Sequence, residues 1–281
     1  AMTSSLVGSE MCIRDSAKAA KKAGRIAAEG LVAVALSDDA KEAAIVEVNS
    51  ETDFVAKNDT FQAYVAEVAD QALTTQAADI EAFLAEESKA EAGKTVKEAL
   101  DGKIAVIGEN LNIRRFSKMA AEDGFVASYI HAGGKIGVLV HVATDVVNDE
   151  IKEMGKNVAM QVAAIAPKYT SRDEVSKDYI DHETEILKIQ AKNENPDKPD
   201  NIIEKMIIGR LNKELKEVCL LDQAYVKAED GKQAVGKYVE QVAKANGANV
   251  TIKEFVRFET GEGIEKKEEN FAEEVAKQMG N

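Results

Sequence analysis

An internal repeat constrains this chain more than any other feature of its sequence. The segment EGLVA at residues 29–33 recurs as DGFVA at 123–127, an offset of 94 residues from position 29 to position 123. The same offset places VEV at 46–48 over VHV at 140–142. Self-similarity at a fixed offset indicates a structural unit that is used more than once. We therefore predict two copies of one fold.

The pattern of apolar residues in each copy predicts a β-hairpin followed by an amphipathic helix. Apolar residues alternate in the strand segments and recur at spacings of three and four in the helical ones. The turns contain Asp38-Asp39 and Gly133-Gly134, which suit hairpin connections. The predicted strands lie at 31–36 and 44–49 in the first copy and at 125–130 and 136–142 in the second, with helices at 60–73 and 149–165.

A third strand closes each copy, and its position reveals an insertion. GENLNI at 108–113 resembles GANVTI at 247–252, an offset of 139 residues from position 108 to position 247. The second copy therefore carries 45 more residues than the first, the difference between the offsets of 139 and 94. Charged helical patterns on both sides of a proline-containing tip predict an antiparallel helical hairpin at about 171–218. This hairpin is either a solvated decoration or an arm that docks a partner.

These patterns predict an α+β protein. Each of two repeated subdomains has an antiparallel three-stranded sheet with helices, and the inserted hairpin and a C-terminal helix complete the fold. We expect core repeats at 17–118 and 119–281. The last helix is expected at 270–278, where Phe271 and Val275 share one face.

Charge and cysteine content limit which classes of partner and which cellular compartment we expect. A net charge of −14 repels phosphate backbones and anionic lipid surfaces, so we expect no direct nucleic acid binding and no membrane binding. Cys12 and Cys219 have no paired spacing, which is typical of thiols in a reducing compartment, and we expect a cytoplasmic protein. Residues 1–16 show no helical, strand or signal-peptide pattern, and we interpret them as a leader foreign to the fold.

The sequence offers no arrangement of residues for catalysis. GKT at 93–95 resembles the end of a P-loop, but Ser88 occupies the place of the first glycine and no strand precedes it. The sequence has no pair of histidines at helical spacing and no CxxC motif, so it does not predict a metal site. We expect no catalytic residue, no metal and no cofactor.

Two histidines and one phenylalanine are candidate functional residues, and their places in the repeat help to interpret them. His141 occupies the position of Glu47, which predicts an outward-facing residue. His131 falls at a hairpin turn, where its imidazole either bonds to nearby backbone or faces a partner. Phe54 is replaced by Asn148 in the second copy, so the fold itself requires no aromatic residue there. Phe54 is either a hydrophobic staple at the start of a helix or an exposed anchor.

These residues carry a resemblance to a known family. Six blocks in order, from about residue 17 to the end, resemble translation elongation factor Ts: KAAKKAG at 18–24, EVNSETDFVAKN at 47–58, IGENLNIRR at 107–115, SYIHAGGKIGVLV at 128–140, NVAMQVAA at 157–164 and RFETGEGIEK at 257–266. Members of this family help the GTPase elongation factor Tu to release GDP. The resemblance also implies the doubled core and the protruding helical hairpin.

The resemblance implies a mechanism that works by binding. Thr52, Asp53 and Phe54 would bind elongation factor Tu, and the phenylalanine would wedge beside the magnesium site and loosen both the ion and GDP. By matching motifs, the other partner-binding residues would be Lys22, Ile107, His131, Phe271 and Val275. Residues 1–16 lack the TGAGMMDCK-like motif of the family's N-terminal module, so we expect reduced affinity for the partner.

Two other classes of function stay open. An adaptor or chaperone-like protein with the same doubled core would retain elongation factor Tu without accelerating GDP release. An enzyme with an unrecognised site would show a strongly shifted pKa in a deep cleft.

Overall fold

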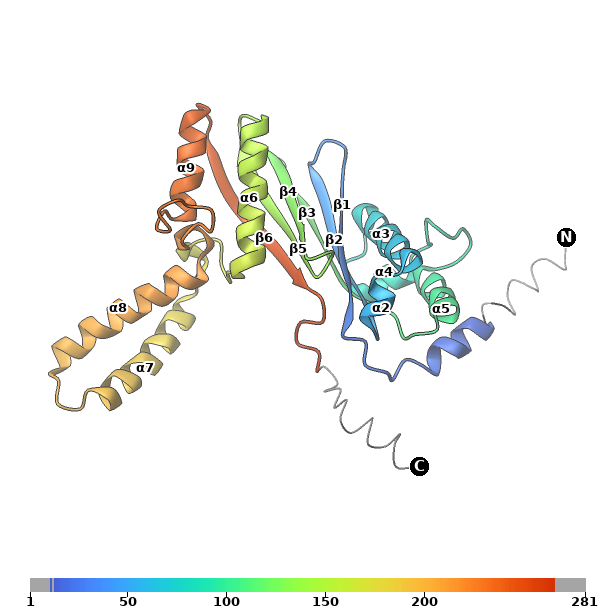
Figure 1. The fold of residues 1–281 in the computed structure, drawn as a ribbon, viewed down its shortest axis with the longest axis horizontal. Coiled ribbons are helices and arrows are strands. Elements are labelled where there is room, and N and C mark those ends of the chain that lie inside the picture. The colour runs from blue at the N-terminus through green and yellow to red at the C-terminus, as the bar shows by residue number, and fades with distance from the viewer. Residues whose placement is uncertain (1–10, 12, 266–281) are drawn as a thin grey trace.

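Two antiparallel three-stranded sheets form the centre of the molecule in the computed structural model, which describes residue 11 and residues 13–265 (Figure 1). The strand orders are β1-β2-β3 and β4-β5-β6. The sheets pack face to face, and helices cover the outer face of each, so the core has four layers. The predicted α+β class with two repeated three-stranded sheets is confirmed. The helix predicted at 270–278, with Phe271 and Val275, lies outside the described residues.

The first sheet packs on a helical layer from the same copy. Its strands are β1 (Glu29–Leu36), β2 (Glu42–Ser50) and β3 (Asn112–Ala120), and its helices are α2 (Asp53–Ala56), α3 (Asp59–Thr74), α4 (Ile80–Ala85) and α5 (Val96–Ile107). Apolar side chains fill the layer between them, among them Val46, Phe61, Phe83, Leu100 and Ile113. Burial of these side chains is the main favourable contribution to folding of this half.

The second sheet repeats this arrangement. Its strands are β4 (Phe125–His131), β5 (Ile136–Thr144) and β6 (Val250–Glu259), and its helices are α6 (Asp149–Ile165) and α9 (Val235–Ala245). The layer between the sheet and these helices contains Val140, Met154, Val158, Val239 and Ile252. The hairpin strands of both copies and the long helices α3 and α6 were predicted close to their observed positions.

Details of the backbone also repeat. A β-bulge interrupts the pairing between Glu47 and Val48 in β2, and another lies at the equivalent place between His141 and Val142 in β5. Gly30 has a φ of +128°, and a Cβ there would lie 2.1 Å from the Val48 carbonyl oxygen. Gly124, 94 residues later, has a φ of +75°, and a Cβ there would lie 1.9 Å from the Val142 carbonyl oxygen. The two copies thus share backbone geometry that only glycine tolerates at these positions.

The helices α2, α4, α5 and α9 were not predicted, and the third strands begin later than predicted. Gly108 adopts a left-handed conformation with a φ of +88° and ends α5, so the segment at 108–111 is a helix cap and loop. The segment GKT leads into the same helix and ends at its N-cap, because the Thr95 hydroxyl accepts a hydrogen bond from Glu98 N at 3.1 Å and the Glu98 carboxylate accepts one from Thr95 N at 2.8 Å. This capping box explains GKT without a nucleotide.

The inserted hairpin projects from the second half of the molecule (Figure 1). It consists of α7 (Lys177–Glu194) and α8 (Asp200–Val218), with the short 3₁₀ helices η1 (Arg172–Glu174) and η2 (Leu220–Asp222) at its base. Ala191, Ile203 and Ile207 form a small core of its own between the two helices. The predicted antiparallel helical hairpin is therefore confirmed.

The inner faces of the two sheets meet in a thin apolar layer. Its members come from both sheets: Val32, Ala43, Ile45, Met119, Ala121, Val126, Leu139 and Phe258. Gly137 permits the close approach, because a Cβ there would lie 2.4 Å from Val32 Cγ1. Both faces of each sheet are thus covered.

Glu47 lies at one end of this layer with its side chain completely buried. Its carboxylate accepts hydrogen bonds from Gly261 N at 2.8 Å, Asn49 Nδ2 at 3.1 Å and Arg115 Nε at 2.6 Å. Arg114 Nη1 adds a further contact at 3.1 Å. Burial alone would raise the pKa of Glu47, but the hydrogen bonds from Gly261 and Asn49 and the charge of Arg115 outweigh it and hold that pKa below its ordinary value.

The same arginines reach the segment that follows the last strand. Arg115 Nη2 donates to the Glu259 carbonyl at 3.2 Å, and Arg114 Nη2 donates to the Glu262 carbonyl at 2.5 Å. Glu47 and its two arginine partners therefore join the first half of the molecule to the end of the second.

The prediction that His141 faces outward is wrong. Its side chain is only 12% exposed, and Nε2 lies 3.1 Å from Asp123 Oδ1. His141 and Glu47 both alternate with residues of the outer core, so they point toward the other sheet. Alternation identified the two faces of each strand correctly, but it does not reveal that a second sheet covers the face opposite the helices.

We predict that Glu47→Gln lowers the free energy of unfolding by about 2–3 kcal/mol at neutral pH, because charge-assisted hydrogen bonds are lost in a buried site. Since the folded pKa of Glu47 lies below the unfolded one, its contribution is present above the unfolded pKa and disappears as pH falls through the folded pKa. Urea unfolding at pH 7 and at about pH 3 measures both effects. The exposed Glu42→Gln on the same strand is the control, and equal stability of Glu47→Gln and the wild type at pH 7 would refute this role.

A pair of glycine substitutions tests the repeated backbone geometry. Gly30→Ala should destabilise the chain by roughly 2–3 kcal/mol, because its Cβ meets the Val48 carbonyl and its φ is positive. Gly102→Ala, in the interior of α5 with open space around it, should stabilise the chain by about 0.5–1 kcal/mol. Chemical denaturation distinguishes the two, and a stabilising Gly30→Ala would contradict the assignment.

Candidate functional site

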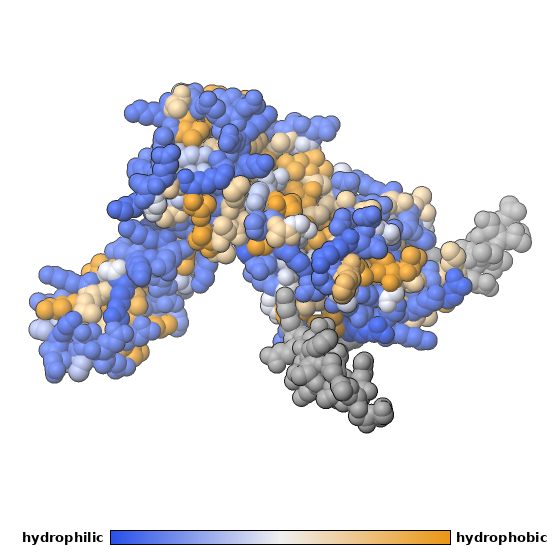
Figure 2. All heavy atoms as spheres, viewed as in Figure 1, coloured by the Kyte–Doolittle hydropathy of each residue, from blue (hydrophilic) through white to orange (hydrophobic). Residues whose placement is uncertain are grey.

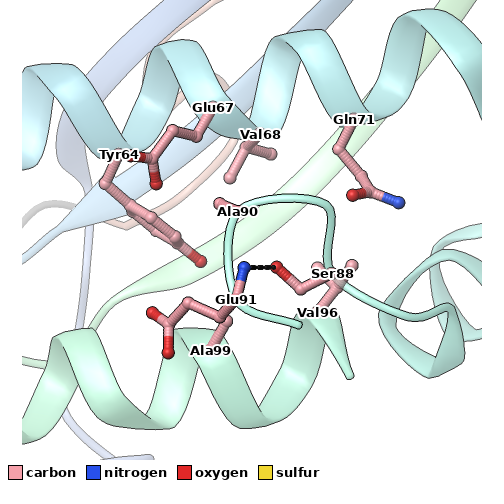
Figure 3. Close-up of a pocket in the computed structure, with 9 residues that line it drawn as sticks. All are labelled: Tyr64, Glu67, Val68, Gln71, Ser88, Ala90, Glu91, Val96 and Ala99. Atoms are coloured by element: carbon pink, nitrogen blue, oxygen red, sulfur yellow. Dashed lines mark hydrogen bonds between the residues drawn. The ribbon is translucent and has the colours of Figure 1, made fainter. Parts of the chain in front are cut away.

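A small cavity lies between α3 and α5, behind the loop at 88–91 (Figure 3). Its volume is about 20 Å³, room for one water molecule and far too little for a nucleotide. Figure 3 shows Tyr64 reaching into this region, where its hydroxyl is buried and has no hydrogen-bond partner among residues 13–265. Burial raises the pKa of Tyr64 above its ordinary value. The cavity suits a structural water at the tyrosine hydroxyl.

Metal and membrane features are absent from the described part of the chain. No group of three His, Cys, Asp or Glu side chains within it is placed to hold a metal ion. None of its helices combines the length and the apolar composition needed to cross a lipid bilayer.

The segment Thr52 to Phe54 forms the start of a one-turn helix at the end of the first sheet. Thr52 is the N-cap of α2, and its hydroxyl oxygen accepts a hydrogen bond from Val55 N at 3.4 Å. Ala56 is buried, whereas Phe54 is 80% exposed, the largest exposed fraction of any large apolar side chain in the described residues. Phe54 is therefore not a hydrophobic staple, and the structure leaves the exposed-anchor interpretation.

Charged groups surround this phenylalanine. Lys57 Nζ lies 2.7 Å from Asp53 Oδ2 across one turn of the chain. The hydrogen bond from Lys57 holds the pKa of Asp53 below its ordinary value, and the positive charge of Lys135 acts in the same direction. Lys135 belongs to the β4–β5 turn of the second copy, so both copies contribute to the electrostatics here. Asp53 is an exposed anion beside an exposed aromatic ring.

The loop between α5 and β3 lies against the residues before α2. Asn110 N donates to Glu51 Oε1 at 2.6 Å, and Asn110 Nδ2 donates to the Arg25 carbonyl at 2.7 Å. Glu109 in the same loop contacts both Glu51 and Thr52. Sequence reasoning missed Glu109, because its partners lie 57 and 58 residues away along the chain.

Ile107 and Lys22 adjoin this loop. Ile107 is the last residue of α5 and is half-buried against the first core. Lys22 Nζ lies next to Gly108, 4.0 Å from where a Cβ at that glycine would be. Val106 lies beside Ile107 and is 78% exposed, and sequence reasoning also missed it. It could have been noticed as an apolar residue that lies outside the buried face of the helix. Figure 2 shows the resulting hydrophobic surface over α5.

His131 ends β4 and is exposed. Its Nδ1 lies 3.1 Å from the Tyr129 hydroxyl, so the imidazole contacts a side chain of its own strand. The following turn contacts β1, where Val32 N donates to the Gly134 carbonyl at 2.7 Å and Lys135 pairs with Glu29. The turn that bears His131 therefore lies beside the first residues of β1.

The structure thus brings most of the predicted residues to one end of the molecule. Lys22 and Ile107 adjoin the loop at 108–110, and this loop contacts Glu51 and Thr52 before α2. The charge of Lys135, in the β4–β5 turn that follows His131, acts on Asp53. Phe271 and Val275 lie outside the described residues. An exposed aromatic side chain on a short helix, bordered by fixed charges, is suited to binding another protein.

Comparisons with known proteins give a consistent result. A family model described as Elongation factor TS matches residues 51–262. Elongation factor Ts of Clostridioides difficile (strain 630) is 57% identical over 262 residues, which cover 93% of this chain and 84% of that protein. Elongation factor Ts of Clostridium botulinum (strain Eklund 17B / Type B) is 52% identical over 264 residues, covering 94% and 85%. That of Clostridium tetani (strain Massachusetts / E88) is 48% identical over 263 residues, covering 94% and 85%.

We predict that Phe54→Ala changes the free energy of unfolding by less than about 0.5 kcal/mol, because an exposed side chain contributes little to the core. Phe61→Ala, seven residues later on α3 and completely buried, should cost about 3–5 kcal/mol. Urea denaturation followed by circular dichroism compares the two. A large loss of stability in Phe54→Ala would show that the ring is packed in solution.

Proposed function

The chain belongs to the elongation factor Ts family, and from this premise we propose that it is a guanine nucleotide exchange factor for elongation factor Tu. It binds the GTPase and promotes GDP release during translation elongation, and it performs no chemistry of its own. The proposed site of action is the cytoplasm, because translation takes place there.

The observation that carries this proposal is the exposure of Phe54. An aromatic side chain that is 80% exposed on an ordered turn contributes almost nothing to its own fold. Transferring such a side chain from water into a protein pocket is worth about 1.5–3 kcal/mol. Central aromatic residues of this kind often dominate binding to a partner.

Exchange follows from differential binding. The proposed role of Phe54, with Asp53 beside it, is to enter the GTPase near its magnesium site and weaken the contacts to the ion and the GDP phosphates. The partner's nucleotide-free conformation accommodates the ring, and the GDP-bound conformation does so less well. Each tenfold loss of GDP affinity corresponds to about 1.4 kcal/mol of this difference. GDP must weaken the binding of the exchange factor by the same ratio.

Residues around Phe54 complete the proposed interface. Thr52 supports the turn, Lys22 and His131 supply polar contacts, and Ile107 extends the apolar surface toward Val106. Phe271 and Val275 are proposed contacts as well, although they lie outside the described residues. The net charge of −14 argues against direct contact with nucleic acid.

The test is the release rate of fluorescent GDP from purified elongation factor Tu. The wild-type chain should accelerate release, and Phe54→Ala should reduce this acceleration by about tenfold to thirtyfold, the loss expected for one anchor residue. Val147→Ala is the matched control, because Val147 is 49% exposed in the equivalent loop of the second copy. It should behave as the wild type.

Two outcomes would contradict the proposal. If the chain binds elongation factor Tu and GDP release stays at its basal rate, the protein is an adaptor. If Phe54→Ala and Val147→Ala both match the wild type in accelerating release, another part of the surface drives exchange.

A further inference from the structure

We infer that Glu109 is a positioning residue that holds Phe54 in its exposed orientation. The inference rests on the proposed function, because it assigns to Glu109 a role in presenting Phe54 to elongation factor Tu. Glu109 itself need not touch the partner.

The Glu109 carboxylate binds the two residues that precede α2. Its Oε1 accepts a hydrogen bond from the Thr52 hydroxyl at 2.6 Å. Its Oε2 accepts hydrogen bonds from Glu51 N and from Thr52 N, each at 3.1 Å. Hydrogen bonds to an ionised acceptor are among the stronger ones in proteins. Three of them fix the backbone at the N-terminus of α2.

The helix needs this support because it is very short. It has four residues, and a single turn gains little from its own hydrogen bonds. At its C-cap, the N–H of Lys57 is shared between the carbonyl oxygens of Asp53 and Phe54, both at 3.2 Å. Ala56 is its only buried residue. Val55 adds a half-buried contact with the first core. The direction in which Phe54 points therefore depends on the packing of Val55 and Ala56 and on how the ends of the turn are held.

The second copy of the fold provides an internal comparison for this loop. In the first copy, Asn110 N donates to Glu51 Oε1 at 2.6 Å. At the equivalent place in the second copy, Asn249 N donates to Asp145 Oδ1 at 2.8 Å. A link between these two loops is thus present in both copies and belongs to the shared fold.

The hydrogen bonds of Glu109 have no counterpart in the part of the second copy that the structure describes. The offset of 139 places Ala248 at the position of Glu109, and the offset of 94 places Val146 at the position of Thr52. Neither alanine nor valine has a side chain that can form these bonds. The second copy folds without them, and it also lacks Phe54. The additional hydrogen bonds therefore occur together with the aromatic residue and are not a requirement of the fold.

This comparison supplies the informative substitutions. Glu109→Ala gives the first loop the residue that the second copy tolerates, so the chain should still fold. Glu109→Gln keeps one carbonyl oxygen for the two backbone N–H groups, and its amide can donate to the Thr52 hydroxyl oxygen. The glutamine variant should therefore preserve most of the support, and the alanine variant should remove it.

The first measurement is hydrogen–deuterium exchange of the amides at 55–57 in the isolated chain. Glu109→Ala should accelerate exchange there by about tenfold or more, the result of losing roughly 1.4 kcal/mol of local stability. Glu109→Gln should stay within about twofold of the wild type. Unchanged protection in Glu109→Ala would overturn the inference without any reference to the partner.

The second measurement is GDP release from elongation factor Tu in a double-mutant cycle. Glu109→Ala should reduce the acceleration by about threefold to tenfold, and it should change the rate by less than about twofold in a Phe54→Ala background. Glu109→Gln should restore the wild-type rate. Asp145→Ala breaks the corresponding link of the second copy and should leave the rate unchanged.

The failures of the two proposals are distinguishable. If Glu109→Ala has the same effect with and without Phe54, Glu109 does not act through the phenylalanine and the inference is wrong. If Phe54→Ala itself leaves the acceleration intact, the proposed function of Phe54 fails, whatever Glu109 does to the amides at 55–57.

Discussion

The buried carboxylate of Glu47 joins the two halves of the molecule at the end where the candidate site lies. It binds Arg114 and Arg115 of its own sheet and the Gly261 amide after the last strand. A buried charge of this kind is stable only when it is fully paired, so the geometry around it is strongly determined. The β4–β5 turn is attached near this joint, because Thr260 N, next to Gly261, donates to the Lys135 carbonyl. The end of the molecule that bears Phe54 is therefore built from both copies, which are joined there by the Glu47 contacts and by the pairing of Lys135 with Glu29.

The proposed functional residues lie where the two copies differ. Phe54 replaces Asn148, Glu109 replaces Ala248, and Glu47 replaces His141 at a bulge that both copies keep. The shared features are the strand register, the bulges and the positive-φ glycines, and they specify a fold that can be built twice. The differing residues add an exposed aromatic side chain, its support and the joint between the halves. A duplicated fold thus separates structural requirements from functional ones within a single sequence.

The sequence predicted much of this, and the exceptions have physical reasons. The hairpins and long helices follow from local periodicity, and the inserted helical hairpin follows from the difference between the two offsets. The third strands were placed too early, because Gly108 and Gly247 adopt left-handed conformations after α5 and α9. The burial of His141 depends on a second sheet that covers the opposite face of its strand. Whether Phe54 is a staple or an anchor can be decided only from the exposed fraction of its side chain. The contacts of Glu109 could not be predicted, because they join residues that are distant in the chain.

The central claim is that this chain binds the nucleotide-free GTPase more tightly than its GDP-bound form through Phe54. Calorimetric titration of the chain into elongation factor Tu, with and without saturating GDP, measures that difference at equilibrium. The account predicts weaker binding to the GDP-bound form, by the same ratio by which the chain weakens GDP binding, and a much smaller ratio for Phe54→Ala. Equal affinity of the wild-type chain for both forms would contradict it, because a ligand without differential affinity shifts no equilibrium.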